Sequence, residues 1–312
     1  MYACSPKWKD DWISKKDLRD VLLQLSGRIK GSPFGPERVG LNYGLHFTGG
    51  EPFLNFPLLV EAVVLAHELG IPSMFVETGC YWCINEDVTR EKLSQLANAG
   101  LDGLLVSVNP FLLEQVPFER TQRAVNVGRE LFGGNLLVYQ QTFYDQFEAL
   151  EFRNVVPFVE YMRRCPTGLK YAELIPMGRA PYRLGHLFKK YPASHFFGES
   201  CREELTRGWH IHVDNYCNYM TGYCGGISLG DARHLDTLTG QGIDLEEHPI
   251  LAALVTDIEE LYKLGMERFG YKAQSEGYIS KCHLCTDIRR YIIAETDEFR
   301  ELNPREFYFH LD

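Results

Sequence analysis

The chain has 312 residues, of which 45% are hydrophobic and 24% are charged, a composition typical of folded globular proteins. Asp and Glu total 42 against 32 Lys and Arg, so the formal net charge is −10. This acidity disfavours nucleic acid as a partner, because contacts to phosphate need clustered cations. The sequence has no apolar run of membrane-spanning length and no apolar N-terminal segment of the signal-peptide kind. We therefore expect a cytoplasmic protein without a membrane partner.

The first two-thirds of the sequence alternates amphipathic stretches with short apolar runs. The helical spacing of apolar residues predicts helices at residues 17–29, 55–70, 86–99, 118–132 and 155–164. The apolar runs predict strands at residues 40–47, 73–76, 104–108, 136–142 and 171–175. Asn55 is expected to cap the second helix, which should stop at Gly70.

Strand followed by helix, repeated five times with strands that are apolar throughout, predicts an α/β fold with a parallel sheet covered by helices. The pattern fits a barrel and an open doubly wound sheet equally well. In either case a binding site is expected at the carboxyl ends of the strands. The pattern changes after residue 185. Two short strands at 209–213 and 218–223 and helices at 250–269 and 282–294 predict a small α+β domain over residues 186–312.

The first predicted strand ends in the run Thr48-Gly49-Gly50-Glu51-Pro52. Two glycines in succession let a backbone approach a ligand closely, and a carboxylate and a rigid proline follow them. A plain tight turn between strand and helix would explain a Gly-Gly pair as well. The complete string, however, resembles the GGEP motif of the radical S-adenosylmethionine enzymes.

Later strand ends support this resemblance. They are similar, in the same order, to runs of that family: Glu77-Thr78-Gly79, Ser107-Val108-Asn109-Pro110, and Pro176-Met177-Gly178-Arg179-Ala180. The resemblance covers residues 1–185 and implies a partial TIM-like barrel of six βα units that lacks its first strand here. It implies that S-adenosylmethionine binds at Gly49, Gly50, Glu51, Pro52, Glu77, Ser107, Asn109, Gln141 and Arg179. Glu77 and Arg179 have structural alternatives, as a strand-end carboxylate held by backbone N–H groups and as a residue that closes the barrel.

The family also implies a 4Fe–4S cluster held by a CxxxCxxC loop after the first strand, and no such pattern occurs in the 312 residues. We therefore expect that the natural N-terminus is missing, and that the cluster loop precedes Met1. Cys4 is a candidate for its last cysteine. If the chain begins at Met1, the alternative is a catalytically inactive relative that binds a nucleoside-like ligand or a partner. A barrel hydrolase is disfavoured, because no nucleophile–His arrangement or His/Asp cluster lies at the strand ends.

Nine cysteines are present, an odd number that fits a disulfide framework poorly. Cys282 and Cys285 form a CxxC at a helix start, where thiolates are favoured. With Cys201 and Cys224 they would supply four ligands to a structural zinc ion or an auxiliary iron–sulfur cluster. The alternatives are four reduced thiols, or Cys217 as one of the ligands. A second CxxC, Cys80 with Cys83, is interpreted as packing.

The segment around Cys224 resembles the SPASM or twitch extensions of radical S-adenosylmethionine enzymes, although the full seven-cysteine pattern is absent. The resemblance implies a 5′-deoxyadenosyl radical that abstracts hydrogen from a substrate. It also implies an electron donor such as flavodoxin or ferredoxin. A peptide or protein substrate is expected, because such extensions often accompany peptide modification.

Overall fold

A computed structural model describes residues 5, 7–170 and 175–311. The chain forms two compact units. Residues 25–174 form one, here called the sheet unit, and residues 1–24 with 175–312 form the other, the helical unit. This division differs from the predicted domains, 1–185 and 186–312, chiefly because the N-terminal residues associate with the C-terminal half.

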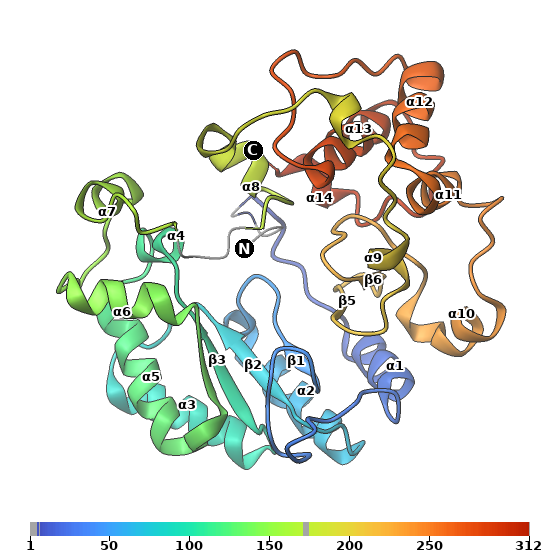
Figure 1. Cartoon of the computed structure of the whole chain (residues 1–312). Helices are drawn as coiled ribbons and strands as arrows, with labels where there is room; N and C mark the ends of the chain where they lie inside the picture. The colour runs from blue at the N-terminus through green and yellow to red at the C-terminus, as the bar shows by residue number, and fades with distance from the viewer. Residues whose placement is uncertain (1–4, 6, 171–174, 312) are drawn as a thin grey trace. The chain divides into compact units, whose positions relative to one another are not determined.

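The sheet unit is built on four parallel strands. They are β1 (His46–Phe47), β2 (Phe75–Thr78), β3 (Gly103–Ser107) and β4 (Leu136–Tyr139). Their order in the sheet is β1-β2-β3-β4, and Figure 1 shows them side by side in this sequence. The first four predicted strands are therefore present, but the first of them is paired over only two residues. Residues 171–174 of the fifth predicted strand lie outside the described residues.

Helices alternate with these strands. They are α2 (Phe56–Glu68), α3 (Glu86–Asn98), α4 (Pro110–Leu113), α5 (Phe118–Phe132), α6 (Gln141–Ala149) and α7 (Phe158–Arg164), with short 3₁₀ turns η1 (Pro52–Asn55) and η2 (Gly133–Asn135). The predicted cap is confirmed, since the Asn55 side chain accepts a hydrogen bond from the N–H of Leu58. Packing joins α5 to β3 and β4, and α3 to α5. Each crossover leads to the next strand on the same side of the previous one. Crossovers that are all right-handed then place the connecting helices on one face of the sheet.

Strands β2 and β3 form the core of the sheet unit. Val76, Leu104 and Val106 have no exposed surface, and Phe75 and Leu105 are 1% exposed. A strand buried on both faces needs apolar side chains at every position rather than at alternate ones. This requirement explains why these segments read as continuous apolar runs in the sequence.

The helical unit contains α1 (Lys15–Leu25) and a cluster of helices from the C-terminal half. The latter are α8 (Ala180–Leu184), α9 (Arg202–Thr206), α10 (Leu235–Gln241), α11 (Pro249–Thr256), α12 (Ile258–Phe269), α13 (Lys281–Glu295) and α14 (Glu306–Phe309), with 3₁₀ turns η3 (Gly185–Leu187), η4 (Ala193–Phe196) and η5 (Ala232–His234). The predicted antiparallel pair is confirmed as β5 (Ile211–Val213) and β6 (Tyr219–Thr221). Helix α12 packs against both α11 and α13, with Ile258, Leu261 and Ile288 buried.

The prediction of one helix over residues 250–269 is wrong. The helix ends at Thr256 because Asp257 adopts an extended backbone, with φ −164° and ψ 141°. The Asp257 carboxylate then accepts from the N–H of Glu259 at 2.8 Å and caps α12. It also accepts from the N–H of Gly198 at 2.9 Å, a contact distant in sequence that helical spacing does not reveal.

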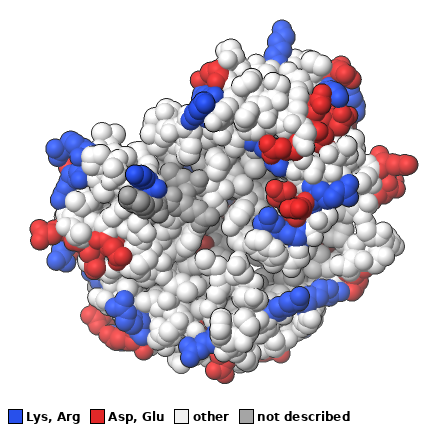
Figure 2. Space-filling view, viewed as in Figure 1, with Lys and Arg blue, Asp and Glu red and all other residues white. Residues whose placement is uncertain are grey.

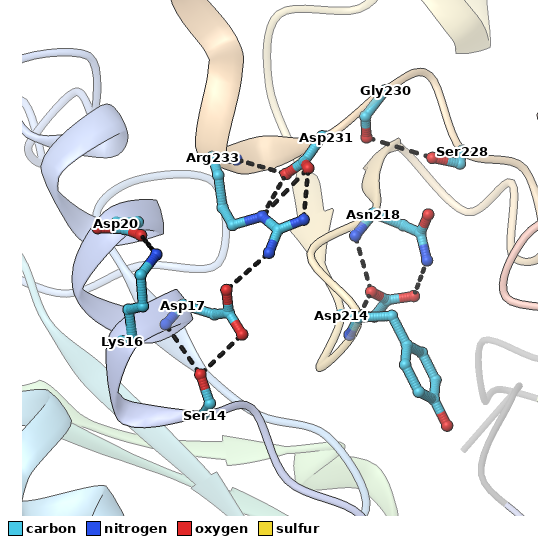
Figure 3. Close-up of polar contacts among 11 residues, drawn as sticks. Ser14, Lys16, Asp17, Asp20, Asp214, Asn218, Ser228, Gly230, Asp231 and Arg233 are labelled. Atoms are coloured by element: carbon cyan, nitrogen blue, oxygen red, sulfur yellow. Dashed lines mark hydrogen bonds and ion pairs between the residues drawn. The ribbon is translucent and has the colours of Figure 1, made fainter.

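An ion-pair network holds α1 in the helical unit (Figure 3). The Arg233 guanidinium donates to Asp17 at 2.7 Å and to Asp231 at 2.7 Å. Ser14 donates to the same Asp17 carboxylate at 2.7 Å, so the start of α1 is fixed from two directions. These contacts account for part of the association of the first residues with the second half of the chain.

Charged side chains of both signs are interspersed over the face shown in Figure 2, and Lys and Arg do not gather there in one field. Within the part of the chain that the structure describes, no helix is long and apolar enough to cross a membrane.

Candidate functional site

The carboxyl edge of the parallel sheet collects the polar residues that follow β1, β2 and β3. The loop after β1 carries Gly49, whose φ of +135° favours glycine, and Gly50. A Cβ added at either position would meet no atom within 4 Å. The backbone of this loop therefore faces open space, where a ligand can approach it closely.

Glu51 follows the glycines and binds across to the end of β2. Its carboxylate accepts from Thr78 Oγ1 at 3.0 Å and from the N–H of Gly79 at 2.8 Å. It also accepts from the N–H of Phe53 at 3.3 Å, which makes it the cap of η1. Pro52 is buried as the first residue of that turn. The motif thus links two neighbouring strand ends through one side chain.

The environment of Glu51 favours its protonated form. Burial raises the pKa of the carboxyl to about 7, against the lowering effect of its hydrogen bonds from Gly79, Phe53 and Thr78. The nearby negative charge of Glu77 raises it further. Glu51 therefore exchanges its proton close to neutral pH.

Glu77 lies on the same edge and is held in the ionised form. Burial opposes ionisation, but the His46 imidazole and the Ser107 hydroxyl hold the pKa of Glu77 at about 2. His46 Nε2 lies 3.3 Å from Glu77 Oε2, and Ser107 donates to Oε1. Thr48 Oγ1 donates to Oε2 at 3.0 Å. Among the described residues, the hydrogen-bond donors to Glu77 are the hydroxyls of Thr48 and Ser107 rather than backbone N–H groups.

Two carboxyl groups with oppositely shifted pKa values thus share one sheet edge. An ionised carboxylate attracts a cationic group, and a carboxyl with a pKa near neutrality can accept or release a proton there. Such a pair beside open backbone is a good candidate for a ligand site. Its chemistry fits a ligand that carries a cation and hydrogen-bonding groups.

Three residues predicted to contact the cofactor, Asn109, Gln141 and Arg179, have other structural surroundings than Glu51 and Glu77. Asn109 is 6% exposed, and its Oδ1 accepts from the N–H groups of Phe111 and Leu112, so it caps α4. Gln141 is the first residue of α6 rather than part of a strand, and its Nε2 donates to Asp145 at 2.7 Å. Arg179 belongs to the helical unit, where it precedes α8.

Sequence reasoning missed the residues that support Glu51 and Glu77. Thr78 accepts from the Trp82 indole N–H at 2.9 Å while it donates to Glu51. Trp82 in turn stacks on Phe53, with ring centroids 4.0 Å apart. The only sequence signal was the position of these residues immediately beside the strand ends and the motif.

The second CxxC lies beside Thr78, since the N–H of Cys80 donates to Thr78 Oγ1 at 3.0 Å. Cys80 and Cys83 have no exposed surface, in agreement with the packing interpretation. Contact with Cys83 and burial both raise the pKa of the Cys80 thiol. Neutral buried thiols of this kind act as small apolar side chains.

In the helical unit, the four cysteines predicted to bind metal line one cavity of about 30 Å³. Cys201 directly precedes α9, and Cys282 and Cys285 lie in the first turns of α13. Cys224 follows the end of β6 by a short turn rather than ending the strand itself. Three separate segments therefore bring their thiols to the same place. Cys217 does not line this cavity.

The thiols of this cysteine cavity influence one another. Burial, followed by the proximity of Cys285, raises the pKa of Cys224 to about 11 and that of Cys282 to about 12. Within the described residues, no three His, Cys, Asp or Glu side chains are arranged as a ready metal site. A metal would have to draw these thiols onto itself and displace their protons.

The chain matches no family model, and no curated protein is similar to it at a significant level. Any functional assignment therefore depends on the sheet edge and the cysteine cavity themselves.

Proposed function

We propose that this chain is a radical S-adenosylmethionine protein, with the cofactor at the carboxyl edge of its parallel sheet. The observation that carries the proposal is the meeting of Gly49-Gly50, Glu51 and Glu77 at that edge, around backbone that faces open space. These residues come from the motifs on which the resemblance rests. Their convergence is expected if the motifs form one binding site.

The strand order supports a partial barrel. In a doubly wound sheet the order of strands reverses at a switch point, whereas in a barrel each strand lies beside the next one in sequence. The order β1-β2-β3-β4 has no reversal. It is therefore the order expected for consecutive units of a barrel of the (βα)₆ kind.

The chemistry of the edge suits S-adenosylmethionine. Ionised Glu77 would attract the positive charge of the cofactor, and the loop at Gly49 and Gly50 has space beside it for the amino group of the cofactor. Ser107 and Thr48 orient Glu77 by hydrogen bonds and would contact the ribose side of the ligand. With one electron passed through a 4Fe–4S cluster from a donor such as flavodoxin or ferredoxin, bound S-adenosylmethionine would be cleaved to methionine and a 5′-deoxyadenosyl radical. That radical would abstract hydrogen, in this proposal from a peptide or protein.

An auxiliary metal centre at Cys201, Cys224, Cys282 and Cys285 is the second part of the proposal. Four thiols from three segments that line one cavity supply the donor set of a zinc ion or an iron–sulfur cluster. The centre would also connect segments of the helical unit that are distant in sequence.

Replacing Gly50 tests the cofactor site. A Cβ at this position meets no protein atom, so Gly50→Ala should leave the fold unchanged and place a methyl group where the ligand would bind. We expect at least tenfold weaker binding of S-adenosylmethionine by calorimetric titration. Gly40→Ala is the matched control, because its Cβ also meets no atom within 4 Å. Equal affinity in wild type and Gly50→Ala would contradict the assignment.

A second measurement separates catalysis from binding alone. This measurement needs a form of the protein that carries a CxxxCxxC segment. After anaerobic reconstitution of that form with iron and sulfide, reduction with dithionite should release 5′-deoxyadenosine from S-adenosylmethionine. Binding without cleavage under those conditions would favour the alternative, an inactive relative that binds a nucleoside-like ligand.

A further inference from the structure

Arg289 is a buried cation beside the cysteine cavity. Its side chain is 3% exposed and lines the same cavity as Cys201, Cys224, Cys282 and Cys285. It lies one helical turn after Cys285 on α13, and its Nε donates to the carbonyl oxygen of that residue at 3.3 Å. The charge is therefore fixed next to the thiols.

The partners of Arg289 are all neutral. Its guanidinium donates to the Gly225 carbonyl at 3.0 Å, to the Tyr308 hydroxyl at 2.6 Å and to Thr286 Oγ1 at 3.2 Å. No Asp or Glu among the described residues forms an ion pair with it. Lys281, a second cation near these thiols, differs because Glu199 and Glu204 each lie 3.8 Å from its Nζ.

A buried charge is costly unless a charge of opposite sign lies nearby. Hydrogen bonds to neutral groups satisfy the guanidinium N–H groups but leave its charge uncompensated. A thiol that keeps its proton carries no charge and cannot compensate it. A divalent metal bound by four thiolates, by contrast, carries two surplus negative charges at the place that Arg289 faces.

We propose that Arg289 is the counter-charge of the metal–thiolate centre. The inference rests on the proposed auxiliary centre and adds a residue that is not a ligand. The guanidinium fixes the backbone around Cys285 and Gly225, next to Cys224, and its charge stabilises the metal-bound state over the metal-free state. A residue with this role sets metal affinity, and in an iron–sulfur centre it would also raise the reduction potential.

A purely structural role makes a different prediction. If Arg289 only connects Gly225, Thr286 and Tyr308, then any substitution should destabilise the metal-free and metal-bound protein equally. If its charge matters, a substitution that removes the charge should weaken metal binding more than one that keeps it. Comparing Arg289→Gln with Arg289→Lys separates the two roles, because both lose the guanidinium contacts but only Gln loses the charge.

The experiment uses Zn²⁺ alone as the probe, on the full chain, with affinity measured by competition against a chromophoric chelator. The metal-free thermal midpoint is measured for each variant. We expect Arg289→Gln to weaken Zn²⁺ binding about 10- to 100-fold, the range found for groups that support metal ligands, and Arg289→Lys less than about threefold. Arg305→Gln is the control, since Arg305 donates to the carbonyls of Thr296 and Ile293 and does not line the cavity.

Three results would overturn the inference. Equal loss of affinity in the Gln and Lys variants would assign Arg289 a structural role while leaving the metal centre in place. Unchanged Zn²⁺ affinity in the Gln variant would likewise show that the charge of Arg289 does not support metal binding. Wild-type Zn²⁺ binding no higher than that of a Cys282→Ala/Cys285→Ala variant would instead remove the centre itself, and the inference with it.

Discussion

Glu51 and Glu77 show how two identical side chains acquire different properties from their surroundings. Both lie at the carboxyl edge of the sheet, yet the pKa of Glu51 is raised to about 7 and that of Glu77 is lowered to about 2. Burial dominates at Glu51, whereas at Glu77 the imidazole of His46 and the hydroxyl of Ser107 overcome it. The two residues should therefore affect stability in different pH ranges.

Glu51→Gln should remove a pH dependence that lies near neutrality. The pKa of Glu51 rises from 4.5 in the unfolded chain to about 7 in the folded one, so its protonated form stabilises the fold. This contribution is present below pH 4.5 and is lost as pH rises through 7. We expect the unfolding free energy of Glu51→Gln, relative to wild type, to rise by about 1–3 kcal/mol between pH 4.5 and 7.5. Urea titrations at several pH values measure it, and a constant difference would contradict the raised pKa.

Glu77→Gln should have the opposite dependence. The folded pKa of about 2 lies below the unfolded value of 4.5, so ionised Glu77 stabilises the fold above pH 4.5 and loses this effect as pH falls towards 2. The unfolding free energy of wild type should be about 1–3 kcal/mol higher than that of the variant at pH 7. The same urea titrations, extended to pH 3, should show the difference narrowing below pH 4.5. A variant as stable as wild type at pH 7 would argue against the ionised state.

At the scale of elements, local periodicity predicted the helices well and their interruptions poorly. The range of α5, Phe118–Phe132, agrees with its prediction residue for residue. By contrast, α11 and α12 read as one helix in the sequence, because apolar spacing continues across Asp257. What separates them is a cap and the contact from Gly198, and the second of these exists only in the folded chain.

Asp257→Ala should therefore destabilise the helical unit. The substitution removes the acceptor for the N–H groups of Glu259 and Gly198, and loss of a helix cap costs about 1–2 kcal/mol. Urea denaturation of the full chain measures the loss. Asp257→Asn is the matched control, because its side-chain oxygen still accepts; a loss as large as that of Ala would show that capping is not the cause.

At the scale of the whole molecule, the division into units does not follow the order of the chain. Residues 1–24 belong with residues 175–312, and the contacts of Arg233 with Asp17 explain part of this association. An ion pair between exposed groups contributes modestly, about 1 kcal/mol or less. The network at the start of α1 is thus a local attachment rather than a major source of stability.

Arg233→Ala should loosen α1 without affecting the sheet. Loss of about 1 kcal/mol of attachment corresponds to roughly fivefold faster amide exchange in Lys15–Leu25. Hydrogen-exchange mass spectrometry should show this change, with none in β2 and β3. Arg163→Ala, which breaks the pair with Glu160 inside α7, is the control for loss of a surface ion pair. Unchanged exchange in α1 would show that other contacts hold it.

The candidate sites were partly visible in the sequence. Short motifs indicated Gly49, Gly50, Glu51 and Glu77, because polar residues that follow consecutive parallel strands must meet at one edge. The same reasoning placed Gln141 in a strand, whereas it begins α6, and it did not foresee that the Asn109 side chain caps α4. A polar side chain that follows a strand can cap the next helix or bind a ligand, and the sequence alone does not show which of the two it does.

The sequence by itself determined the order of strands and helices and the Asn55 cap, since these depend on residues close together in the chain. The repeated strand–helix alternation also indicated the parallel sheet. Only the tertiary structure decided which cysteines line one cavity, that Arg289 is buried beside them, and how the pKa values of Glu51 and Glu77 diverge. Those properties depend on burial and on groups brought together from distant segments. Desolvation and electrostatic interaction act through space, so they are defined only once the chain has folded.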